Sequence, residues 1–300
     1  MNESDNSPQR RAWPLQAVTP ETDWVRAELH VRAAAVASLS EAEFIRRLRT
    51  AGIAMWAREY TADGSASGFV IETPIGSGRT RCDGEIAPDL ALGVLREQWE
   101  RGDLAHTQAF GEWRGLHSPG VFDRDRILLS HPAMWSRMFS DAGRFNQDLR
   151  SAPVRADSEW GWAAARLAGA FAAWSLRVEP QAVGPFAAAA HELGRSARSL
   201  TAGADALVIR RRLVRANLSR VAFGLAQLDH DDAGDPADRS LLLVIQLSAG
   251  VIAIGKAHRR RGELSRAQAL AEVGASLHVV CRELHARTHT SPPDHGAGGR

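Results

Sequence analysis

Large apolar side chains recur in alternating steps of three and four residues through the second half of the chain. This spacing places them on one face of an α-helix and is typical of helices that pack side by side. Four segments carry it: Trp160, Ala164, Leu167, Phe171, Trp174; Phe186, Ala190, Leu193, Ala197, Leu200; Val214, Leu218, Val221, Leu225, Leu228; and Leu270, Val273, Leu277, Val280, Leu284. With the apolar run Leu241–Ile254 as a further helix, residues 157–287 are predicted to form a five-helix antiparallel bundle.

The run Leu241–Ile254 (LLLVIQLSAGVIAI) is 14 residues long and contains Gln246 and Ser248. A helix that crosses a membrane needs about 20 consecutive apolar residues. We therefore interpret this run as a buried core helix and predict no membrane span.

A different pattern precedes the bundle, in residues 21–101. Ser40 and Glu43 match the capping box that begins a helix, and Gly52 stands where a glycine in the left-handed conformation ends one. The apolar face of this helix is supplied by Phe44, Ile45 and Leu48. The sequence therefore predicts a short helix with a defined start and end.

Three strands and a second helix are predicted after Gly52. Ile53–Tyr60, Gly68–Thr73 and Arg79–Asp83 alternate or are rich in strand-forming residues, and turn sequences separate them. Leu90–Arg101 then has helical periodicity that ends on Trp99. Residues 21–101 are thus predicted to form a module of helix, three-stranded antiparallel meander and helix.

Residues 102–156 are less regular. A helix is predicted after His131 and Pro132, with an apolar face of Met134, Trp135, Met138, Phe139 and Phe145. We interpret the interval as a linker and a docking helix that packs the module onto the bundle; a binding loop is the alternative. The polar segments 1–20 and 288–300 are expected to be disordered, so the predicted fold class is α+β, mostly α.

Composition narrows the functional classes. The chain is 44% hydrophobic and 24% charged, with a net charge of +2, which is ordinary for a globular protein and excludes a strongly polybasic one. Its two cysteines, Cys82 and Cys281, are far apart, so neither a disulfide framework nor a structural zinc site is expected. With a polar N-terminus, these features favour a reduced, cytoplasmic protein.

The order of residues 44–99 carries a family resemblance. The matching positions are Phe44, Leu48, Gly52, Ile53, Gly68, Phe69, Ile71, Gly84, Ile86, Ala87, Asp89, Leu90, Leu95 and Trp99. In this order they resemble the module that follows the nuclease domain in plasmid relaxases (mobilisation proteins) of actinobacteria. The preceding helix and the alanine-rich helices downstream are similar to the family's as well, so the resemblance covers Trp24 to Arg287. The loop Arg81–Gly84 departs from the family's glycine-rich loop.

Relaxases of this family cleave DNA with a tyrosine nucleophile and a metal held by a His-hydrophobe-His motif. This chain has no His-x-His sequence, and its single tyrosine is Tyr60. His285 and His289, four residues apart, are interpreted as a solvated pair rather than metal ligands. We therefore predict no catalytic residues, no metal site and no cofactor, so that the chain is not an enzyme.

Arginine clusters are the remaining candidates for binding. Arg46, Arg47 and Arg49 lie on the first module helix, Arg210, Arg211, Arg212 and Arg215 begin the third bundle helix, and Arg259, Arg260 and Arg261 end another. Solvated helix faces and caps would account for them. Guanidinium groups in clusters also bind phosphates without reading bases, so we predict sequence-independent DNA contacts at the first two clusters.

Two functional hypotheses result. In the first, implied by the resemblance, the chain is a non-catalytic accessory protein of plasmid mobilisation or conjugation that binds a relaxase or another conjugation protein, and DNA without sequence specificity. In the second, it is a helical scaffold or oligomerisation protein unrelated to DNA transfer. Both allow a homo-oligomer.

Overall fold

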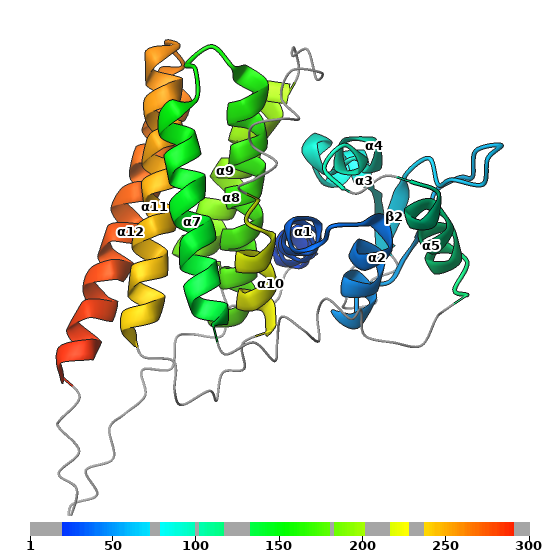
Figure 1. The fold of residues 1–300 in the computed structure, drawn as a ribbon, viewed down its shortest axis with the longest axis horizontal. Coiled ribbons are helices and arrows are strands. Elements are labelled where there is room, and N and C mark those ends of the chain that lie inside the picture. The colour runs from blue at the N-terminus through cyan, green and yellow to red at the C-terminus, as the bar shows by residue number, and fades with distance from the viewer. Residues whose placement is uncertain are drawn as a thin grey trace, which may run out of the picture.

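A computed structural model describes residues 20–72, 79–99, 102–116, 133–180, 183–201, 217–227 and 237–290. These residues are mostly helical and include one small three-stranded antiparallel sheet, which confirms the predicted α+β, mostly α class. Long helices form a helical body on one side of the molecule, and the sheet lies among short helices on the other (Figure 1). Helix α1 lies between the two parts.

Helix α1 (Pro20–Ala37) contributes to both hydrophobic cores. Leu29 and Val36 are buried with the helical body, whereas Ala27 and Val31 are buried with the sheet. Gly169 of α8 permits this close packing, because a Cβ atom there would overlap Cγ2 of Val36. The alanine-rich sequence of α1 therefore serves two packing surfaces at once.

The sheet unit begins as its capping residues predict. Helix α2 spans Glu41–Thr50, and the Ser40 side chain accepts a hydrogen bond from the Glu43 backbone N–H at 3.2 Å. The Glu43 carboxylate accepts from the Leu39 backbone N–H rather than from Ser40. Gly52 has a φ of 76°, which is the left-handed conformation predicted for the end of this helix.

The predicted meander is confirmed, with shorter strands. β1 (Met55–Ala57), β2 (Phe69–Glu72) and β3 (Thr80–Cys82) pair antiparallel in the order β1-β2-β3. Ile71 of β2 lies opposite Met55 on one side and Arg81 on the other. Phe69 and Ile71 point into the core, as the alternation of side chains along a strand requires.

The single helix predicted over Leu90–Arg101 is wrong. The chain instead forms α3 (Asp83–Ile86), a 3-10 turn η1 (Pro88–Leu90) and α4 (Leu92–Arg96), followed by α5 (Asp103–Trp113). The buried Asp83 carboxylate explains the break, because it accepts hydrogen bonds from the Gly84 and Leu92 backbone N–H groups at 2.9 and 2.8 Å. This tertiary contact begins α4 at Leu92.

The described helices of the body are α7 (Met134–Ser151), α8 (Asp157–Val178), α9 (Pro185–Thr201), α10 (Ser219–Gln227), α11 (Ala237–Arg260) and α12 (Leu264–Thr290). The apolar residues predicted at steps of three and four mostly face the core of this helical body, where the structure describes them. Of the third predicted helix, residues 214–216 and Leu228 lie outside the described residues. The predicted docking helix is α7, which packs along α10 and α11 and buries Met138 and Phe145 in the body. It is α1 that joins the body to the sheet unit.

A buried ion pair fixes α1 to the sheet unit. The guanidinium group of Arg32 contacts Asp89 of η1 through Nη1 at 2.6 Å and Nη2 at 3.3 Å, and its Nε contacts Glu28 at 2.8 Å. Burial alone would lower the pKa of Arg32. The negative charges of Asp89 and Glu28, and the hydrogen bonds that they accept from Arg32, outweigh burial and raise the pKa. Gly194 of α9 lies against this group, since a Cβ there would be 2.5 Å from Cζ of Arg32.

We expect Asp89→Asn to lower the free energy of unfolding by about 3–5 kcal/mol, because it leaves the buried Arg32 charge without its main partner. Urea denaturation measures this. Arg144→Ala is the control, because the Arg144 side chain is 55% exposed where it contacts Asp141. Its loss should cost less than about 1 kcal/mol. Equal costs for the two variants would contradict the central role of Arg32 and Asp89.

Candidate functional site

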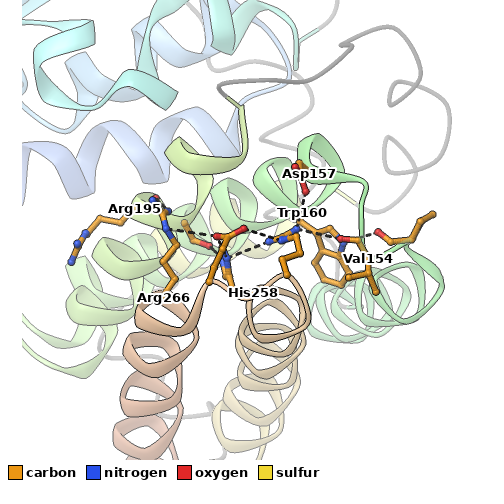
Figure 2. Close-up of polar contacts among 10 residues, drawn as sticks. Val154, Asp157, Trp160, Arg195, His258 and Arg266 are labelled. Atoms are coloured by element: carbon orange, nitrogen blue, oxygen red, sulfur yellow. Dashed lines mark hydrogen bonds and ion pairs between the residues drawn. The ribbon is translucent and has the colours of Figure 1, made fainter.

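The most extensive described polar cluster lies at one end of the helical body (Figure 2). Ser196 comes from α9, His258 from the last turn of α11, and Glu263 from the connection between α11 and α12. Gly262, with a φ of 80°, allows the chain to turn there. The turn places Glu263 against the helix end, where its backbone N–H donates to the His258 carbonyl at 3.0 Å.

The hydrogen bonds of His258 have a defined direction. Its Nδ1 lies 2.7 Å from the Glu263 carboxylate and 3.2 Å from Nη2 of Arg261. The carboxylate can only accept and is the nearer partner, so we assign the proton of the neutral ring to Nδ1. In the neutral ring Nε2 is then an acceptor, and it contacts the Ser196 hydroxyl. Serine, histidine and an acid are connected in the same sense as in the Ser-His-Asp triad of hydrolases.

Arginines hold the acidic end of this cluster. Arg261 contacts Glu263 at 3.1 Å and Asp157 of α8 at 3.2 Å. Arg266 lies 3.8 Å from Glu263 and donates to the Arg195 carbonyl of α9 at 3.0 Å. The cluster therefore connects α8, α9, α11 and α12.

The electrostatics keep His258 neutral. Burial is the main cause that lowers its pKa; contact with Glu263 opposes the shift, and the charges of Arg261 and Arg266 reinforce it. For Glu263, partial burial opposes ionisation, but the contact with His258 and the two arginines lower the pKa overall. At neutral pH the arrangement is a neutral imidazole beside a carboxylate.

Burial argues against hydrolase chemistry in this cluster. His258 is 0% exposed and Ser196 is 2% exposed, so a substrate cannot approach either one without rearrangement of the helices. Ser196 also lies within α9, where backbone N–H groups are engaged in helical hydrogen bonds and cannot form an oxyanion hole. The cluster therefore has a structural role, which is to hold helix ends together. Its three residues are not among those predicted from the sequence.

The predicted arginine clusters have different environments. Arg46 and Arg49 of α2 both contact Glu112 of α5, and Arg47 lies 3.6 Å from Glu43 and 4.6 Å from the Phe223 ring centre. These three guanidinium groups therefore hold α2 against α5 and α10. Arg210, Arg211, Arg212 and Arg215 lie outside the described residues, and their role stays a prediction.

Other residues considered for chemistry are not brought together. Tyr60 pairs with Ala66 in an isolated bridge and is 45% exposed. Cys82 and Cys281 are free and half-buried. In the described part of the chain, no group of three or more histidine, cysteine and acidic residues has metal-binding geometry. α12 continues to Thr290, which places residues 288–290, predicted as part of the disordered tail, in a helix.

A second buried arginine lies between the body and the sheet unit. Arg166 of α8 donates to the Gln98 side chain at 2.6 Å and stands 5.1 Å from the Trp162 ring centre. Burial lowers its pKa to about 10. Its Nε has no hydrogen-bond partner among the described residues, so a carbonyl oxygen and an aromatic face are what stabilise the charge.

The outward side of α11 is an exposed apolar surface. We call the residues Leu242, Ile245, Ala249, Ile252 and Lys256 the outer stripe. Its three large apolar side chains, Leu242, Ile245 and Ile252, are 53%, 48% and 50% exposed. The opposite side buries Leu243, Val244, Leu247, Val251 and Ile254 in the body core.

Because both sides of α11 are apolar, this helix resembles a membrane-spanning helix in length and composition. Arg239–Arg260 is the one stretch within the described helices that is long and apolar enough to cross a membrane by length and composition, and 39% of its most apolar window is buried. The predicted core helix is thus observed on the inward side of α11. The outward side is apolar too, which the sequence interpretation did not anticipate.

Comparisons with protein-family models, curated proteins and solved structures find no match for this chain.

We expect His258 to make stability depend on pH. Its pKa is lowered in the folded state, so below about pH 6.5 the unfolded chain binds a proton that the folded chain does not. Stability should fall as the pH decreases from 6.5 toward the folded-state pKa, by up to about 1.4 kcal/mol per pH unit for this group.

Urea denaturation between pH 7.5 and 5 tests this by comparing wild type with His258→Asn. The variant should be less stable at pH 7.5 and should show a weaker loss on acidification. His278→Asn, at an exposed position of α12, is the matched control and should behave as wild type. An unchanged pH dependence in His258→Asn would show that the buried imidazole does not contribute.

Proposed function

We propose that the chain is a non-catalytic interaction protein of plasmid mobilisation or conjugation, acting in the cytoplasm by binding a relaxase or another conjugation protein. The observation that carries the interaction role is the outer stripe of α11. The resemblance of residues 24–287 to the part of relaxases that follows the nuclease domain supports the biological context.

The outer stripe supports binding because of its composition and continuity. A helix on the surface of a bundle ordinarily has polar residues on its outward side. Here no charged residue occurs between Arg239 and Lys256, and large apolar side chains stand along the exposed face. Apolar surface that is contiguous rather than scattered is characteristic of interaction sites.

The location of the reactive groups supports a non-catalytic role. In the one described serine–histidine–acid arrangement, Ser196 and His258 are both buried, so neither the nucleophile nor the base is accessible to a substrate. Tyr60, which would have to replace the relaxase nucleophile, is exposed beside Ala66 and is 5.3 Å from the guanidinium group of Arg114. Neither arrangement offers a nucleophile next to an accessible base.

DNA contact without sequence specificity is a secondary part of the proposal. It rests on Arg210, Arg211, Arg212 and Arg215, because the arginines of α2 are engaged with Glu43 and Glu112. The alternative function, a helical scaffold unrelated to DNA transfer, would use the same outer stripe. Plasmid transfer separates the two functions.

We expect the triple substitution Leu242→Ser, Ile245→Ser and Ile252→Ser to reduce plasmid transfer at least tenfold while leaving the fold intact, because it removes the exposed apolar contacts. Transfer frequency between host cells is the measurement. Affinity capture from the host, with and without nuclease, should recover a relaxase or coupling ATPase with wild type and not with the variant.

Val279→Ser is the control, since Val279 is 42% exposed on α12 outside the stripe. It should transfer plasmids as wild type does. Normal plasmid transfer after deletion of the gene would refute the mobilisation role. The helical scaffold would then be the remaining hypothesis. Capture that is lost on nuclease treatment would indicate DNA rather than protein as the partner.

A further inference from the structure

The residues of the outer stripe are spaced almost symmetrically about the middle of α11. We propose that it is the interface between two copies of this chain, in which two α11 helices pack antiparallel with Ala249 at the two-fold axis. This inference rests on the proposed function only in taking the stripe as a binding surface. It adds that a second copy of the chain covers this surface, so the triple serine variant would lose plasmid transfer through loss of the dimer that the conjugation protein binds.

The positions of the stripe are nearly symmetric about Ala249. Leu242 and Lys256 lie seven residues to either side, and Ile245 and Ile252 lie four and three residues away. An antiparallel pair therefore brings Ile245 of one copy against Ile252 of the other, on both sides of the axis. Alanine at the crossing point has a small side chain and lets the two backbones approach.

The charges at the end of the stripe favour the antiparallel orientation. In a parallel pair, Lys256 would meet Lys256 of the other copy within the seam. In the antiparallel pair the aliphatic part of Lys256 covers Leu242 of the other copy, and its ammonium group extends to water. Antiparallel helices also place their dipoles in the favourable orientation.

The neighbouring helices extend the contact surface. α11 packs along α7 on one side and α12 on the other (Figure 1). Ile252 lies 4.0 Å from where a Cβ of Gly274 on α12 would be, so this side of the stripe borders α12. On α7, Trp135 and Phe139 are half-buried and pack against the core of the body.

The surface has the size that a modest dimer needs. The sixteen uncharged residues Ser240–Gly255 span about 24 Å at 1.5 Å per residue, and three adjacent helices at 8–10 Å spacing make the face about 20 Å wide. That is about 500 Å² in projection, of the same order as the roughly 800 Å² per partner of a standard interface. The exposed face of α11 alone, without its two neighbouring helices, would be too narrow for a stable dimer.

Cysteine cross-linking of the full chain tests the orientation and register. In a background of Cys82→Ser and Cys281→Ser, Ala249→Cys should form a disulfide-linked dimer rapidly on mild oxidation, because the axis brings the two residues together. Leu242→Cys should not, since two copies of residue 242 lie about 21 Å apart along the helices, beyond the roughly 7 Å limit between Cα atoms. A mixture of Leu242→Cys and Lys256→Cys chains should cross-link.

Light scattering should give twice the chain mass for wild type and a single chain for Ile245→Glu. A monomeric wild type, or equal cross-linking of Leu242→Cys and Ala249→Cys, overturns the antiparallel dimer. If the monomer instead co-floats with vesicles of phosphatidylcholine and phosphatidylglycerol in a stripe-dependent way, a lipid surface is the occupant and the dimer is likewise overturned. Should wild type be monomeric while the triple serine variant still loses plasmid transfer, the proposed function stands and only the dimer fails.

Discussion

The ion pair between Arg32 and Asp89 is the contact that connects the two cores of this protein. Both side chains are 2% exposed, and the residues are 57 positions apart in the chain. Two charges withdrawn from water are tolerated only when each satisfies the other with good geometry. The pair therefore constrains where η1 lies on α1, and α1 in turn is packed into the helical body.

Helix α1 makes the two parts of the molecule interdependent. An assignment of residues 21–101 to one module and 157–287 to one bundle would place α1 entirely with the sheet. In the structure, one side of α1 completes the sheet unit and the other packs on α8 and α10. Local opening of either part must therefore expose apolar surface of a helix that the other part also needs.

The polar cluster and the apolar outer stripe lie in different parts of the helical body. Ser196 and His258 are buried at one end of the body, and Glu263 is half-buried beside them. Their hydrogen bonds satisfy the buried polar groups and hold helix ends together. The apolar outer stripe lies on the surface, where it costs stability in water unless something covers it. An inward-facing polar cluster with an outward-facing apolar stripe favours a protein that works by binding.

The sequence by itself determined the elements whose signals are local. The Ser40 cap, Gly52 and the heptad-like seams predicted α2, its end and most body helices, because capping and helical periodicity depend on residues a few positions apart. Contacts between distant residues decided the rest. The Asp83 carboxylate broke the helix expected at Leu90, and Ser196 met His258 across 62 positions. Which side of α11 stays exposed depends on where α7, α8 and α12 pack, and an apolar run such as Leu241–Ile254 has no local signal that distinguishes its inward side from its outward side.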